Sequence, residues 1–314
     1  MQRFWSLTAI CSLVSLFLPA TAVWANTGYS HDLDLQARFD DRSDRDHRNQ
    51  YRLRYYPSWT FDSAERWSIN SFVVTGDDFG SSHNTLADGS SEHIYVRRAF
   101  VRYQGDHGKT EVGVIPTYKG RVSSSGLSKD GWIKGVRQVF ELENNAALEW
   151  VAGQLDNTDP AHALDAPDEL NYGELEYSAR LDERHSYEVS VERIREGNFL
   201  RGEYRWKFRD SQTLFLELVQ RLDDPNTKTI AGLSGEFTLG THPLEYFAHY
   251  NYVSEGFGPR AELTEDFLGT GHGISAELSG GLPVHDDAEW FVRLDVVDST
   301  TRLLTGVAIS LDYP

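Results

Sequence analysis

Hydrophobic and polar residues alternate along most of the chain. In 33–39, apolar residues at every second position are separated by Asp34, Gln36 and Arg38, and 200–208 has the same period with charged residues between the apolar ones. A period of two is typical of a β-strand with one apolar and one polar face. The pattern predicts sixteen strands, at 33–39, 51–55, 67–74, 95–103, 109–115, 132–142, 146–152, 171–179, 187–191, 200–208, 214–218, 229–237, 244–252, 270–278, 290–296 and 303–313.

Helix signals are nearly absent. The best candidate is 161–170, which contains Pro167, so we interpret it as a loop that holds at most one helical turn. The sequence shows no repeat at a fixed period and no linker rich in Pro or Ser. We therefore expect a single all-β domain.

The first 25 residues have the pattern of a secretory signal. Arg3 supplies a positive charge, an apolar run covers 7–20, and small residues precede a cleavage position after Ala25. We expect residues 1–25 to be removed and residues 26–314 to form the exported domain. The single cysteine, Cys11, lies in the signal, so that domain has no thiol for a disulfide, a metal site or nucleophilic catalysis.

Composition excludes several classes of protein. The 314 residues include 48 acidic and 30 basic side chains, a net charge of −18, whereas a nucleic-acid-binding protein needs basic residues in excess. After residue 25 no run of about 18 apolar residues occurs, which excludes membrane-spanning helices. The 8 Trp, 15 Tyr and 16 Phe provide more apolar surface than a disordered chain carries.

The connections between the predicted strands alternate in length. If the first strand runs outward, the outer connections are 40–47, 77–91, 117–131, 155–169, 194–197, 222–227, 254–268 and 298–300, most of them long. Most connections at the other end are tight turns, such as 105–108 and 143–145. This alternation, together with an even number of strands, is typical of outer-membrane barrels. Fourteen strands is the alternative count.

Period two alone fits two architectures. A soluble β-sandwich turns its apolar face inward, and a membrane barrel turns it toward lipid. Aromatic residues near strand ends, among them Tyr51, Tyr55, Tyr95 and Tyr103, favour the barrel because they suit girdles at the membrane interfaces. We therefore predict a transmembrane antiparallel up-and-down β-barrel.

The last predicted strand carries a motif. Gly306, Ile309, Leu311 and Tyr313 stand in a Gly-x-x-apolar-x-apolar-x-aromatic frame, which here is followed by Pro314. This frame resembles the C-terminal assembly signal of Gram-negative outer-membrane barrel proteins, and the exported chain as a whole resembles a porin-like barrel. The resemblance implies a place in the cell outer membrane, contact with membrane lipid and lipopolysaccharide, and insertion by the barrel-assembly machinery. It leaves monomer and homotrimer open.

The resemblance also bears on the third outer connection, 117–131. In porins a loop at this place folds inward and narrows the pore, whereas the alternative here is an ordinary exposed loop. The constriction residues that the resemblance implies are Tyr118, Lys119, Arg121, Lys129 and Asp130.

Alternation places many charged residues on the lumen face, with bases concentrated in the first half and acids mostly from the seventh strand onward. The expected pore-lining residues are Arg38, Arg52, Arg54, Arg98, Arg102, Arg137, Arg201, Arg205, Glu149, Glu174, Glu176, Glu188, Glu217, Glu236 and Glu245. Opposed walls of unlike charge create a transverse field that favours hydrophilic, dipolar solutes. The hypothesis is a passive channel for small hydrophilic solutes, anionic ones included. In the alternative, the charges pair and the barrel is plugged or structural.

Arg97 does not fit the alternation, because Arg98 and Arg102 already occupy the lumen face. Either Arg97 reaches lipid phosphates at the interface, or a β-bulge turns it inward.

Other chemistry has weaker support. The loop acids Asp40, Asp41, Asp44 and Asp46 do not have the spacing of a known calcium loop, so we interpret them as solvated, and the histidines lack zinc spacing. We expect no metal site and no cofactor.

A barrel hydrolase would draw on Asp77, Asp78 and His83, yet no Gly-x-Ser-x-Gly motif occurs, so we expect no enzyme. A soluble protein that binds carbohydrate through its aromatics is the remaining alternative.

Overall fold

The structure is a computed structural model that describes residues 28–76, 83–86, 94–116, 132–156, 165–258, 269–298 and 300–313. Its strands are β1 (Gly28–Arg42), β2 (Arg45–Thr60), β3 (Trp67–Thr75), β4 (Asn84–Thr85), β5 (Ile94–Gly105), β6 (Gly108–Pro116), β7 (Trp132–Leu142), β8 (Ala146–Asp156), β9 (Tyr172–Arg180), β10 (His185–Ile194), β11 (Gly197–Arg209), β12 (Gln212–Arg221), β13 (Thr227–Leu239), β14 (His242–Val253), β15 (Gly271–Gly281), β16 (Ala288–Val297) and β17 (Thr300–Tyr313). Apart from the two-residue β4, these are the sixteen predicted strands, so sixteen is confirmed and fourteen is wrong.

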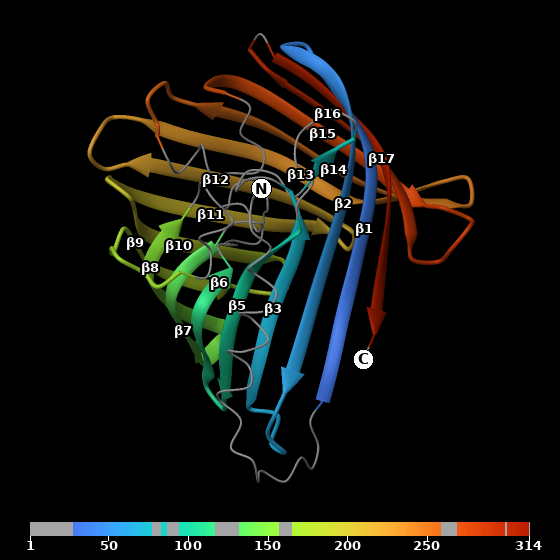
Figure 1. Ribbon diagram of the computed structural model, residues 1–314. Helices are drawn as coiled ribbons and strands as arrows, with labels where there is room; N and C mark the ends of the chain where they lie inside the picture. Colours follow the sequence, from blue (N-terminus) through green and yellow to red (C-terminus); the bar gives the residue numbers. More distant parts are fainter. Residues whose placement is uncertain are drawn as a thin grey trace, which may run out of the picture.

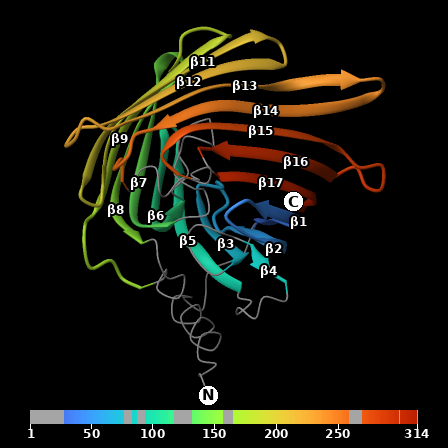
Figure 2. The ribbon, with the colours of Figure 1, turned by 90° about the horizontal axis from the view of Figure 1, so that it is seen from above.

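The strands form a closed antiparallel barrel (Figure 1). Each long strand pairs with its neighbour in the chain, β3 pairs with β5, and β17 returns to pair with β1 from His31↔Tyr313 to Arg42↔Arg302. Seen from above, the strands make a ring (Figure 2). Closure leaves no strand edge open along the ring, because every long strand has two neighbours.

The two ends of the barrel differ in their connections. The four longest connections, β3–β5, β6–β7, β8–β9 and β14–β15, lie at one end, which we call the loop end. At the opposite end, the turn end, every connection has two to six residues, and β1 begins and β17 ends there. The prediction that most outer connections are long is confirmed for four of the eight, and the other four have two to five residues. The connection predicted at 40–47 is a two-residue turn, Ser43–Asp44, because both strands extend further than the pattern indicated.

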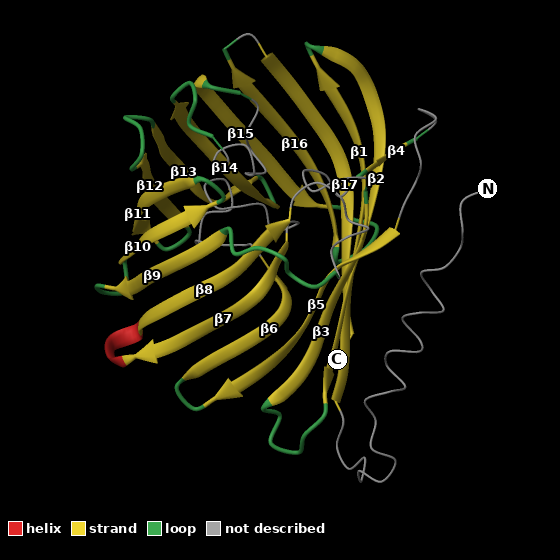
Figure 3. Ribbon diagram, turned by 60° about the vertical axis from the view of Figure 1, so that its left-hand side comes forward, coloured by secondary structure: helices red, strands yellow, loops and turns green. Residues whose placement is uncertain are grey.

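Two asparagines form the left-handed part of the turn between β7 and β8. The β7–β8 turn is a short 3-10 segment, η1 (Glu143–Asn145), drawn in red in Figure 3, in which Asn144 and Asn145 have φ of 59° and 56°. Asparagine tolerates this left-handed region better than most residues. Of the segment 161–170, residues 161–164 lie outside the described ranges, and 165–170 form no regular structure. Within the described ranges, no helix is long and apolar enough to cross a membrane.

The two faces of the barrel wall differ in burial. On β1, Leu35 and Phe39 are each 36% exposed on the outer face, whereas Asp40 is completely buried on the inner face. Aromatic rings gather on the outer face at the turn end, where Tyr29 lies 5.3 Å from Trp59 and Trp67 lies 4.8 Å from Tyr103, measured between ring centroids. The wall is therefore apolar outside and largely polar inside, the reverse of a soluble sandwich.

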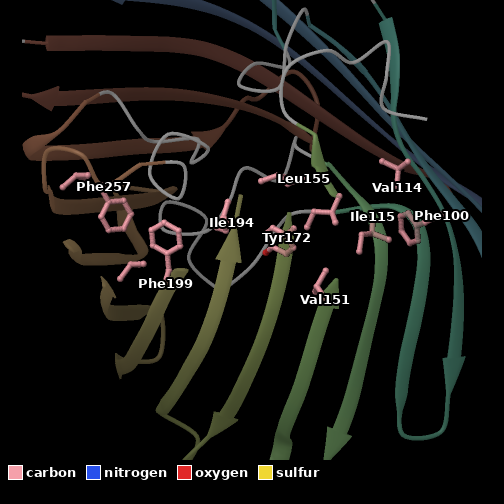
Figure 4. Close-up of a cluster of buried hydrophobic side chains, with 12 residues drawn as sticks. Phe100, Val114, Ile115, Val151, Leu155, Tyr172, Ile194, Phe199 and Phe257 are labelled. Atoms are coloured by element: carbon pink, nitrogen blue, oxygen red, sulfur yellow. The ribbon is translucent and has the colours of Figure 1, made fainter. Parts of the chain in front are cut away.

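The inner wall is not polar throughout. Twelve buried apolar side chains form a cluster that extends from Phe100 on β5 to Phe257 just after β14, and it includes Ile133, Tyr172 and Phe199 (Figure 4). Most of them occupy inward positions near the loop end of their strands, including Ile115, Ile194 and Val253. On β10 and β11 the cluster lies nearer the loop end than the charged residues do, since Ile194 follows Glu192 and Phe199 precedes Arg201.

Candidate functional site

The inner wall of β17, β1 and β2 is rich in arginine. Asp40 at the end of β1 accepts a contact of 2.7 Å from Arg45 and one of 3.2 Å from Arg302, and Arg38 lies 4.0 Å away. Asp40 is therefore a buried ion-pair partner, and its interpretation as a solvated loop acid is wrong. The alternation did not identify Arg45 or Arg302, because both lie outside the shorter strands that it predicted.

The predicted residues Arg52 and Arg54 are buried on the same wall. Arg52 lies 3.0 Å from Asp34 on β1. Arg38 donates from Nε to Gln50 Oε1 at 2.9 Å, and Gln50 donates in turn to Thr85 of β4 at 3.1 Å. We call these arginines, Arg38, Arg45, Arg52, Arg54 and Arg302, the Arg wall; within it, hydrogen bonds join Arg38 to Thr85 through Gln50.

His83, the residue that directly precedes β4, contacts the inner face of β1. Its Nε2 lies 2.6 Å from Gln36 Oε1 on β1. Burial, followed by the charges of Arg38, Arg52, Arg54 and Arg302, holds the pKa of His83 well below its usual range. Of the other hydrolase candidates, Asp77 and Asp78 lie outside the described residues.

A β-bulge in β5 explains the misfit at Arg97. Phe72 pairs with Arg98 and Val73 pairs with Val96, so Arg97 is the extra residue between them. Arg97 is completely buried, Arg98 is also buried, and the Arg98 guanidinium lies 4.6 Å from the centroid of the Phe72 ring. The bulge explanation of Arg97 is confirmed, and two consecutive arginines enter the Arg wall.

The next part of the wall alternates in sign. Arg102 on β5 is the register partner of Glu111 on β6, and Glu111 is the partner of Arg137 on β7. Glu111 lies 2.7 Å from Arg102 and 2.9 Å from Arg137, which also contacts Glu149 at 2.8 Å. Glu111 was not among the predicted site residues, although the period of its strand places it on the inner face.

Glutamates dominate the wall from β8 to β12. Its acidic side chains, which we call the glutamate arc, are Glu149, Glu174, Glu176, Glu188, Glu192, Glu203 and Glu217. Arg201 on β11 is completely buried among them and contacts Glu217 at 2.5 Å, Glu188 at 3.3 Å, Glu176 at 3.4 Å and Glu203. Arg205 contacts Glu203 at 2.7 Å. Glu203 is on the same strand face as these predicted residues but was left out of the predicted set.

The remaining predicted residues lie elsewhere. Glu236 and Glu245 are exposed register partners near the turn end, beside a cavity of about 290 Å³ that Glu277 also lines. Gly306, Ile309 and Leu311 lie in β17, the strand that closes the barrel. Tyr313 is the last residue of β17, and its side chain is not described. The constriction residues Tyr118, Lys119, Arg121, Lys129 and Asp130 lie outside the described residues.

The order of the strands places the two charged walls opposite each other. Counted around the ring, β11 lies eight strands from β2 in either direction. Arg52 and Arg54 therefore stand on the strand diametrically opposite the one that carries Arg201 and Glu203. Within the described residues, no group of three or more His, Cys, Asp or Glu is arranged to hold a metal ion.

Comparisons with known proteins identify the fold. No protein-family model and no curated protein matches the chain. Two mutants of the porin of Rhodopseudomonas blastica have similar structures at 11% identity, each covering 90% of this chain and 100% of its own, with TM-scores of 0.62 and 0.64. A structure described under the asymmetric conductivity of engineered proteins aligns over 91% of this chain and 100% of its own, at 10% identity and a TM-score of 0.60. At this identity the likeness shows a shared fold.

Proposed function

We propose that the protein is a porin-like channel that lets small hydrophilic solutes diffuse passively through an Arg- and Glu-lined lumen. The observation that carries this proposal is the charged inner wall of a closed sixteen-strand ring, with bases and acids on opposite sides. Barrels of about eight strands are filled by their own side chains, whereas barrels of about sixteen leave room for an aqueous path. The porin fold of the similar structures supports the same function.

The outer surface supports a place in a membrane. Exposed apolar residues occur on the outer face of strands all around the ring, from Leu35 on β1 through Val189 on β10 to Val307 on β17. Every long strand has at least nine residues, enough to cross a bilayer when tilted. We propose the cell outer membrane as the location, reached after removal of residues 1–25, with lipid and lipopolysaccharide around the barrel.

The two walls suggest the class of solute. The Arg wall attracts carboxylates, the glutamate arc attracts cations, and the field between them orients dipolar molecules. We propose that small anionic solutes such as carboxylic acids pass along the Arg wall by transient binding. We further propose that 117–131 narrows the path, that the frame from Gly306 to Tyr313 is read by the barrel-assembly machinery, and that the barrels associate as homotrimers.

Single-channel conductance of the refolded protein, residues 26–314, in a planar bilayer tests the proposal. Steady conductance steps under a salt gradient are expected, and the sign of the zero-current potential reports which wall governs small ions. Insertion without any conductance, in a barrel shown to be folded, would contradict the channel and favour a plugged or structural barrel. Lipase and protease assays on the same preparation test the enzymatic alternative.

A further inference from the structure

Arg201 differs from the other cations of the inner wall in the number of acids around it. All three guanidinium nitrogens are engaged: Nε by Glu217, Nη1 by Glu176 and Glu188, and Nη2 by Glu188 and Glu203. The side chain has no exposed surface. A guanidinium presents five donors in a rigid fork, a geometry that a lysine ammonium cannot reproduce.

The carboxylates around Arg201 are held in an arrangement that is unfavourable without it. Glu188, Glu203 and Glu217 are direct register partners on three neighbouring strands. Register partners in an antiparallel sheet lie close together, and like charges at such positions repel. Arg201 lies in the next row, between Ser190 and Val219, and its guanidinium reaches the three carboxylates from there.

Arg205 provides a comparison on the same strand. It faces the same wall and contacts Glu203 at 2.7 Å, but 23% of its side chain is exposed. Both residues contribute one positive charge to the wall. They differ in that Arg201 fixes four carboxylates, whereas the contacts of Arg205 involve a carboxylate that Arg201 already holds.

We propose that Arg201 is a positioning residue that sets the charge selectivity of the channel, because it keeps the carboxylates of the glutamate arc against the wall and away from passing ions. This inference rests on the proposed channel function. With Arg201 in place, six of the seven glutamates of the arc are buried. Without it, the acids lose their shared cation, extend toward the aqueous path and make the lumen more selective for cations.

The zero-current potential in a salt gradient measures this effect as the ratio of potassium to chloride permeability. For R201A the ratio is expected to rise roughly two- to five-fold, because the variant loses one positive charge and also frees carboxylates to approach the passing ion, and wall charge acts oppositely on cations and anions. R205A removes the same charge and is the matched control, with a smaller expected rise. If charge number alone mattered, the two variants would shift the ratio equally.

R201K separates position from charge. The variant retains the positive charge, so a mechanism based on charge number predicts the wild-type ratio. Positioning predicts a raised ratio, because one ammonium cannot engage four carboxylates in the geometry of the guanidinium. R201K also keeps the test decisive if R201A does not fold.

Chemical rescue provides a second readout. Millimolar guanidinium added to R201A is expected to lower the ratio toward that of the wild type, whereas tetramethylammonium, which donates no hydrogen bond, is expected to leave it raised. Equal ratios for R201K and the wild type, or equal shifts for R201A and R205A, would overturn the inference. A wild-type barrel that inserts and does not conduct would instead refute the channel function itself.

Discussion

Deletion of Arg97 tests whether the bulge in β5 is a local insertion that leaves both faces of the strand intact. Val96 and Arg98 already pair with consecutive residues of β3, Val73 and Phe72. Removing the residue between them therefore straightens the ladder and moves no other side chain to the opposite face. R97A is the matched variant, because it removes the same guanidinium and keeps the bulge.

The expected stability follows from this comparison. The free energies of unfolding of the Arg97 deletion and of R97A should agree within about 1 kcal/mol, the contribution of a single hydrogen bond. Deletion of Val101, in the regular part of the same strand, is expected to lower the free energy of unfolding further. It places Phe100 directly next to Arg102, and both side chains face inward in the intact strand. Because adjacent residues of a strand face opposite sides, the segment from Arg98 to Phe100 must turn over.

That reversal carries Arg98 to the outer face. An arginine facing lipid destabilises a membrane barrel by about 2 to 4 kcal/mol at the bilayer midplane and by less near the interfaces. Arg98 is the fifth residue of β5 counted from its loop end, so a loss of about 2 kcal/mol is expected. Urea titration of the proteins in liposomes, followed by tryptophan fluorescence, measures these differences. A Val101 deletion as stable as the Arg97 deletion would refute both the bulge argument and the assignment of the outer face to lipid.

Two further expectations concern glycines and turns. A Cβ on Gly135 would lie 2.2 Å from the carbonyl oxygen of Ala152, whereas a Cβ on Gly173 would meet nothing within 4 Å. G135A should therefore sharply lower the yield of folded barrel, measured on heat-modifiable gels, and G173A should not. In the β9–β10 turn, the backbone N–H of Arg184 and that of the next residue lower the pKa of Asp182. Because this pKa is lower in the folded protein than in the unfolded chain, the ionised carboxylate stabilises the fold above the unfolded-state pKa. That stabilisation is lost as the pH falls through the folded-state pKa. D182A should therefore lose less stability than the wild type when the pH falls below about 4. An equal loss of stability in the two proteins during an acid titration would contradict this expectation.

The strands could be predicted from the sequence because their pattern depends on local information. Each side chain faces one of two surroundings, and a period of two reports this without reference to any other strand. The same reasoning placed most of the charged residues on the inner face. It gave no information on their partners, because the ion pair between Asp40 and Arg302 exists only when β17 closes on β1, across most of the chain.

Strand ends and irregularities were harder to predict for a related reason. Arg45 was assigned to a loop because the charged residues from Asp40 onward resemble a solvated segment, whereas burial of Asp40 between two arginines extends both strands. The sequence indicated a conflict at Arg97 but not its solution. The bulge depends on the register with β3, which no single strand encodes.

Two rows of the inner wall show that ion pairing alone does not account for its charges. In the row Arg102, Glu111 and Arg137, neighbouring strands alternate in sign, as expected for side chains that pair to stabilise a barrel. In the row Glu188, Glu203 and Glu217, three neighbouring strands carry the same sign, which opposes folding unless a cation is supplied from another row. Arg201 supplies it, and the wall diametrically opposite, on β2, is basic. This separation of charge favours the proposed channel over a structural barrel, because opposed walls of unlike charge orient dipolar solutes.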